Sequence, residues 1–179
     1  MRLSKVWVLI LSCCAFALAA EDHVIENNQI KVTFSANDST LAPGHKTTLV
    51  IEIEPKPKIH LYAPGAKGYL AVDWQMDQSK AWNALPTVFP TSHMLNLPAI
   101  NETVPVFSER IRLVRDLTLG ADADLQSSLA ADRMLAVAGS LQYQACDDKL
   151  CYFPKTIPLT WNFKVAQADA RPVPERKAR

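Results

Sequence analysis

The segment that decides the fold is residues 135–165, which read LAVAGSLQYQACDDKLCYFPKTIPLTWNFKV. Apolar side chains alternate with small or polar ones over residues 135–145, and the same alternation returns over residues 157–165. Strict alternation is typical of a strand with one buried face. Cys146 and Cys151 therefore lie between the end of one strand and the start of the next, across an acidic tip. The pattern predicts a β-hairpin with a dithiol or a disulfide at its mouth.

Shorter alternating patterns elsewhere predict further strands, separated by turns rich in Pro, Gly, Asn and Asp. We expect a polar lead-in at 21–28, strands at 30–34, 49–53, 70–76 and 111–113, an extended piece at 59–65, one short strand within 80–97, and at most one helical turn within 116–133. Seven or eight short strands predict an all-β fold, an immunoglobulin-like antiparallel β-sandwich. The usual immunoglobulin disulfide joins strands far apart in sequence, so a pair five positions apart does not staple the two sheets together.

The first twenty residues have the pattern of a secretory signal peptide. Arg2 and Lys5 precede an apolar run over residues 6–18, which ends in small residues suited to cleavage. We expect residues 21–166 to form the sandwich domain and residues 167–179 a disordered basic tail, because the tail has little apolar content. A lipid anchor is the less favoured alternative: Cys13 follows Leu11 and Ser12, but the apolar run continues past it.

Removal of this segment leaves Cys146 and Cys151 as the only cysteines. The net charge moves from +1 to −1, because Arg2 and Lys5 leave and no acidic residue lies among the first twenty. A nearly neutral domain offers no electrostatic footprint for nucleic acid. No second apolar stretch approaches the length of a transmembrane helix. We expect an exported, soluble monomer in the periplasm or another extracytoplasmic compartment, where thiols can oxidise.

The spacing of the cysteines leaves two interpretations open. A structural disulfide closing so short a loop stabilises the fold by only about 2 kcal/mol or somewhat more in the chain-entropy model. A redox-active pair would instead cycle through a mixed disulfide with a partner. Metal binding is a third possibility, with two thiolates and His60 or His93 holding copper or zinc. No Cys-x2-Cys motif or methionine cluster supports it, so we expect no metal and no cofactor.

The context of the cysteines favours the redox interpretation. Residues 143–146 (YQAC), followed by residues 151–154 (CYFP), resemble the active-site hairpin of the DsbD N-terminal domain family of thiol:disulfide interchange proteins. Residues 60–66 (HLYAPGA) and 101–107 (NETVPVF) resemble further segments of this family. The resemblance extends over roughly residues 25–165.

The resemblance implies an immunoglobulin-like domain that passes reducing equivalents to exported proteins. It implies that Cys151 engages partners and that Cys146 resolves the mixed disulfide. It also implies that a loop caps the pair at rest, here residues 101–107, which we call the cap segment. The implied partners are thioredoxin-like proteins and a separate membrane electron donor, engaged by transient mixed disulfides. The residues expected to cap or line the site are Asn101, Glu102, Val104, Phe107, Tyr62 and Tyr143.

The chain departs from the family pattern at two places. It has four residues between the cysteines, one fewer than the best-known members, and its cap segment lacks the aromatic that usually follows an acidic pair. Which residue shields the sulfurs is therefore left open. His60 could line the site or face solvent, and Tyr143 and Tyr152 could flank the site or pack in the core. The alternative function is a non-catalytic binding sandwich with a structural disulfide.

Overall fold

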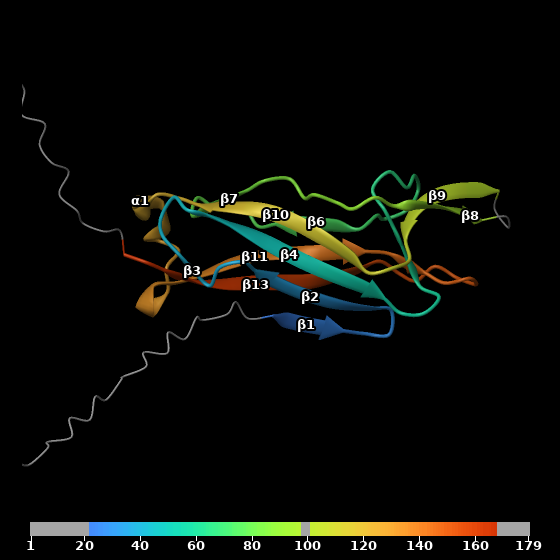
Figure 1. Cartoon of the computed structure of the whole chain (residues 1–179), viewed down its shortest axis with the longest axis horizontal. Helices are drawn as coiled ribbons and strands as arrows, with labels where there is room; N and C mark the ends of the chain where they lie inside the picture. The colour runs from blue at the N-terminus through green and yellow to red at the C-terminus, as the bar shows by residue number, and fades with distance from the viewer. Residues whose placement is uncertain (1–21, 98–100, 168–179) are drawn as a thin grey trace, which may run out of the picture.

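Two β-sheets pack face to face along the long axis of the molecule (Figure 1). The computed structural model describes residues 22–97 and 101–167. The first sheet has the order β1-β2-β4-β10-β7, with β1 at His23–Glu26, β2 at Ile30–Ala36, β4 at Lys46–Pro55, β10 at Ile111–Leu119 and β7 at Trp82–Ala84. The second has the order β3-β13-β11-β6, with β3 at Thr40–Leu41, β13 at Lys155–Val165, β11 at Met134–Tyr143 and β6 at Asp73–Met76.

The alternation of apolar and polar residues in the sequence matches the alternation of buried and exposed side chains in the strands. Along β13, every second side chain from Ile157 to Val165 is buried and those between are exposed. β11 pairs with β13 antiparallel over ten residue pairs, from Met134–Lys164 to Tyr143–Lys155. The predicted hairpin is therefore confirmed, since its apolar face is the inner face of the second sheet.

Aromatic side chains from both sheets meet in the centre of the core. Trp74 and Trp161 are stacked with ring centroids 5.5 Å apart, and Phe34 of the first sheet meets Trp161 edge-on at 5.3 Å. The guanidinium of Arg115 lies over Trp74, 4.9 Å from the ring centroid. Large aromatic contacts of this kind dominate the energetics of a core, so they fix how the two sheets pack.

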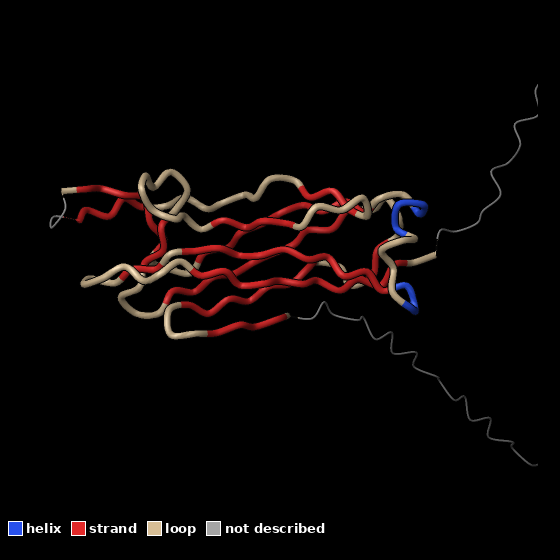
Figure 2. The backbone as a smooth tube through the Cα atoms, turned by 180° about the vertical axis from the view of Figure 1, so that it is seen from behind, coloured by secondary structure: helices blue, strands red, loops and turns tan. Residues whose placement is uncertain are grey.

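A third, smaller sheet positions the cysteines. Its order is β12-β5-β9-β8, with β12 at Ala145–Cys146, β5 at His60–Tyr62, β9 at Glu102–Phe107 and β8 at His93–Leu97. The chain leaves the second sheet after Tyr143 and pairs Ala145 with Leu61 and Cys146 with His60. The β8–β9 strands and the bend between β12 and β13 lie at the same end of the molecule, opposite the end that holds α1 (Asp122–Leu125) (Figures 1 and 2).

The all-β sandwich is confirmed, but the strand count of seven or eight was too low. Thirteen strands lie within the described residues. The lead-in carries β1, and residues 80–97 carry two strands, β7 and β8, where one was expected. Several of the extra strands have only two to four residues, too few for a period-two pattern to be detected. Residues 116–133 complete β10 and then form α1 and a 3-10 turn at Ala131–Arg133.

The expected signal peptide and all but the first residue of the expected tail lie outside the described residues. Their assignment, and with it the division of the chain into three parts, stays a prediction. Within residues 22–97 and 101–167, none of the helices is long and apolar enough to span a bilayer.

Gly139 offers a test of the sheet packing. A Cβ atom there would lie 2.5 Å from the backbone oxygen of Gln75 on the neighbouring strand β6. Because a backbone atom in a paired strand cannot move aside cheaply, Gly139→Ala should destabilise the fold by about 1–3 kcal/mol. At about 2–4 °C per kcal/mol for a domain of this size, Tm should fall by several degrees in a thermal melt. Ala136→Ser, at an exposed position of the same strand, should change Tm little, and equal melting of both variants would contradict this packing.

Candidate functional site

Cys146 and Cys151 form a disulfide between a buried residue and an exposed one. Their Cα atoms are 4.0 Å apart. Cys146 lies in β12 with 1% of its surface exposed, whereas Cys151 is exposed to solvent. An attack by an external thiolate on the exposed residue, Cys151, would make Cys146 the departing sulfur.

The four-residue loop between the cysteines is organised by Asp147. One carboxylate oxygen accepts hydrogen bonds from the backbone N–H groups of Lys149 (2.8 Å) and Leu150 (2.9 Å). The other accepts a hydrogen bond from the hydroxyl of Tyr152 at 2.8 Å. These hydrogen bonds hold the pKa of the Asp147 carboxyl below its usual value, with the largest effect from the backbone of Lys149, followed by Tyr152 and Leu150. The short loop is thus held in shape by an Asx turn.

The hydroxyl of Tyr62 lies against both sulfurs. Its oxygen is 3.2 Å from the Sγ of Cys151 and 3.3 Å from the Sγ of Cys146. Because a disulfide sulfur carries no hydrogen, the hydroxyl is the donor to either sulfur. Tyr62 is fully buried, and this burial raises its pKa, so the hydroxyl keeps its proton at neutral pH.

Tyr69, in the loop between β5 and β6, covers Tyr62. The two rings are stacked with centroids 4.1 Å apart, and the hydroxyl of Tyr69 donates to the carboxylate of Glu102 at 2.7 Å. This hydrogen bond raises the pKa of Tyr69 to about 12, with burial and the charge of Glu102 adding to it. Glu102 thereby joins the cap segment to the β5–β6 loop. The cap segment is strand β9 over Glu102–Phe107, so the expectation of a loop there is wrong, because these residues pair with β5 and β8.

His60 is buried beside Cys146, so the interpretation in which it faces solvent is wrong. It is 7% exposed, because β5 lies between β12 and β9 and its three residues are all buried. Its Nε2 has no hydrogen-bond partner among the described residues. Burial lowers the pKa of His60, because it removes water from the charged imidazolium. The negative charges of Asp148 and Asp147 act in the opposite direction, and the charge of His93 lowers the pKa further.

The predicted cap and lining residues occupy two different environments. Val104 and Tyr62 lie with Cys146 in one buried cluster, and Leu95, Leu97 and Tyr69 pack against it. Asn101 is exposed, with a left-handed φ of 51° just before β9. Phe107 and Tyr143 belong to the main core instead.

Tyr143 is oriented away from the disulfide by its hydrogen bonds. Its hydroxyl accepts from the Nδ2 of Asn27 at 3.0 Å and donates to Gln29 at 3.4 Å. Sequence reasoning missed Tyr69, Leu95 and Leu97, which come from segments with no cysteine nearby. No local pattern marks them, because only the pairing of β5, β9 and β8 brings them to the sulfurs.

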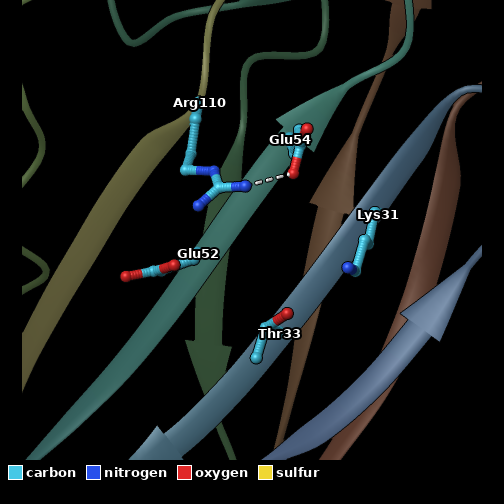
Figure 3. A pocket seen from close by; sticks show the side chains of 5 residues that line it. All are labelled: Lys31, Thr33, Glu52, Glu54 and Arg110. Carbon is cyan, nitrogen blue, oxygen red and sulfur yellow. Dashed lines mark hydrogen bonds and ion pairs between the residues drawn. The ribbon is translucent and has the colours of Figure 1, made fainter.

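Other parts of the described chain offer no comparable site. Among residues 22–97 and 101–167, no group of three or more His, Cys, Asp or Glu side chains is arranged to hold a metal ion. A polar hollow on the first sheet is lined by Lys31, Thr33, Glu52, Glu54 and Arg110 (Figure 3). Arg110 forms an ion pair with Glu54 at 2.6 Å there, and the hollow contains no sulfur.

Comparison with known proteins gives a family match. A family model described as "Thiol:disulfide interchange protein DsbD, N-terminal" matches residues 22–160. The N-terminal periplasmic domain of ScsB from Proteus mirabilis is similar in structure, with a TM-score of 0.50 and 12% identity over 79% of this chain. This chain covers 49% of that one. The reduced DsbD N-terminal domain from Neisseria meningitidis gives a TM-score of 0.41 and 11% identity, covering 63% of this chain and 74% of that one. No curated protein matches the sequence.

The hydrogen bond between Tyr69 and Glu102 can be tested by titration. A raised pKa means that the neutral phenol is favoured in the folded state. The hydrogen bond therefore stabilises the folded state at pH values below the ordinary tyrosine pKa of about 10, and this stabilisation is lost as the pH rises through 12. We expect NMR titration of labelled tyrosines to place Tyr69 near 12, and Glu102→Gln to move it back towards 10. The control is Asp148→Asn, a substitution at an exposed position near the cysteines, which should leave the pKa of Tyr69 unchanged. A pKa of Tyr69 near 10 in the unaltered protein would contradict the hydrogen bond to Glu102.

Proposed function

The chain belongs to the family of DsbD N-terminal domains, and we propose that it is an exported thiol:disulfide interchange domain. It passes reducing equivalents to partner proteins through the Cys146–Cys151 pair. The observation that carries this proposal is the unequal exposure of the two bonded cysteines, since Cys151 is exposed while Cys146 is almost completely buried. Exchange needs one sulfur open to attack and a second within bonding distance to resolve the adduct.

The exchange follows from this asymmetry. A thiolate of the donor attacks the Sγ of Cys151, the bond between the cysteines breaks, and Cys146 leaves as a thiolate. The Tyr62 hydroxyl, 3.3 Å from this sulfur, is in place to donate a hydrogen bond to it. The second thiol of the donor then attacks the mixed disulfide, which releases an oxidised donor and a reduced Cys146/Cys151 pair. In the next half-cycle the Cys151 thiolate attacks the disulfide of an acceptor, and Cys146 resolves that adduct.

We further propose that the cap segment and β8 cover Cys146 at rest and move when a partner docks. The packing of Val104 against the Cys146 cluster supports a cover. The hydrogen bond between Glu102 and Tyr69 supports a cover that two segments share, because it links β9 to the β5–β6 loop. Of the expected cap residues, Glu102 and Val104 carry these contacts.

The proposed partners are thioredoxin-like proteins and a membrane electron donor, each engaged by a transient mixed disulfide. The proposed location is the periplasm or another extracytoplasmic compartment. The signal-peptide pattern of residues 1–20 supports export, and the similar ScsB domain is described as periplasmic. This chain spans about half the length of that ScsB chain, so any activity of a longer protein is likewise a proposal.

The roles of the two cysteines can be separated by substitution. Cys151→Ser should abolish exchange with a reduced thioredoxin-like protein, because the accessible sulfur is gone. Cys146→Ser, with Cys151 first oxidised to a mixed disulfide with a small aromatic thiol, should form a lasting mixed disulfide with a thioredoxin-like protein whose second active-site cysteine is replaced by serine. The aromatic thiol leaves, and neither protein then holds a resolving thiol. Non-reducing gels and intact mass would measure the adduct. The reverse pattern, with the adduct on Cys151→Ser alone, would reverse the assignment.

The reduction potential separates exchange from the structural alternative. An exchange-active pair should lie within reach of thioredoxin-like donors, at roughly −270 to −120 mV. Equilibration with glutathione or dithiothreitol, followed by thiol alkylation, would measure it. A potential well below about −300 mV would favour a binding domain with a structural disulfide.

A further inference from the structure

Phe153 is an exposed aromatic side chain two residues after the accessible cysteine. It is 93% exposed, the largest value among the exposed large apolar residues of the described chain. Cys151 and Phe153 are both exposed, whereas Tyr152 between them is half-buried, so the cysteine and the ring are both open to solvent on this short segment. A single exposed apolar side chain is common on protein surfaces, so what distinguishes Phe153 is its place two residues from Cys151, where burial of the ring against a bound partner would be favourable.

The backbone on either side of Phe153 is anchored. The N–H of Tyr152 donates to the carbonyl of Ala145 at 2.8 Å, and the side chain of Gln144 donates to the carbonyl of Tyr152 at 3.3 Å. Pro154 follows with its fixed φ, and β13 begins at Lys155. The ring is therefore presented on a pre-ordered segment, which lowers the entropy cost of binding through it.

A hollow of about 520 Å³ lies beside the ring. Tyr152, Phe153 and Pro154 line one side, and Asn28 and Gln29 of the β1–β2 turn line the other. That turn is fixed as well, because the Oδ1 of Asn27 accepts hydrogen bonds from the N–H groups of Gln29 and Ile30 at 2.9 and 3.1 Å. The surface is thus a preformed apolar projection with a hollow next to it.

The geometry points to one occupant, and this inference rests on the proposed exchange function. We propose that Phe153 and the adjoining hollow dock the apolar surface around the reactive cysteine of a thioredoxin-like protein. A mixed disulfide brings the partner's sulfur to about 2.05 Å from the Sγ of Cys151. Two residues of chain span at most about 7 Å, so a folded partner bonded to Cys151 lies within reach of Phe153.

Charge gives no competing explanation for recognition at this surface. Asp147, Asp148 and Lys149 lie on the loop before Cys151, and Lys155 lies after Pro154, so two charges of each sign are present and neither sign dominates. Strong electrostatic steering needs a potential of one sign. Recognition therefore depends on apolar contact, as at interfaces where a few aromatic side chains carry most of the affinity.

A comparison of protein and small-molecule reductants tests the proposal. Phe153→Ala should lower the second-order rate constant for reduction of the Cys146–Cys151 disulfide by reduced thioredoxin about tenfold to thirtyfold, the effect of removing an aromatic hot spot. The rate constant with dithiothreitol should stay within about twofold, because a small thiol reaches Cys151 without covering Phe153. Phe153→Leu should recover most of the rate with thioredoxin. The matched control is Val88→Ala, which truncates another exposed apolar side chain, 65% exposed and bridged to Val114 of the first sheet.

The possible outcomes separate this inference from the function on which it rests. Equal rates for the unaltered protein and Phe153→Ala with thioredoxin would overturn the docking role alone. An equal loss in Val88→Ala, or an equal loss with dithiothreitol, would also overturn it. Failure of the unaltered protein to react with thioredoxin, although dithiothreitol reduces it, would contradict the proposed function and the docking role together. Unchanged Tm in Phe153→Ala would show that the altered rates do not come from misfolding.

Discussion

The short pairing between β12 and β5 is the constraint on which the site depends. Two residues, Ala145 and Cys146, leave the long hairpin and bond to Leu61 and His60 of the small sheet. This pairing buries one cysteine, while the Asp147 turn brings the other back to within bonding distance at the surface. Without it, both cysteines would lie in one exposed loop, and nothing would decide which sulfur a visiting thiolate attacks.

The small sheet also gives the buried sulfur a polar contact in an otherwise apolar cluster. Tyr62 sends its hydroxyl to both sulfurs, and its burial keeps the phenol protonated. A thiolate generated in such a place is costly to leave without a hydrogen bond. Tyr69 and Glu102 complete the arrangement from two other segments, through the ring stacked on Tyr62 and the hydrogen bond between them.

The bend between β12 and β13 has an outer side that is exposed to solvent, in contrast to the buried side around Cys146 and Tyr62. The segment after Cys151 turns Tyr152 inward, towards Asp147 and the core, and leaves Phe153 in solvent. The residue that fixes the loop and the residue that we propose as the docking contact are therefore neighbours in sequence.

The sequence by itself determined the hairpin of β11 and β13, the all-β sandwich and the two cysteines at the turn. Each rests on a relation between neighbouring residues, since a period of two in polarity can be detected within a single strand. Only the tertiary structure decided that Cys146 is buried and Cys151 exposed, that His60 faces inward, and that Tyr143 and Phe107 lie in the main core. It also decided that Tyr69 covers Tyr62. These facts depend on which distant strands pair, and pairing is selected by the free energy of burying whole faces together, which no local pattern specifies.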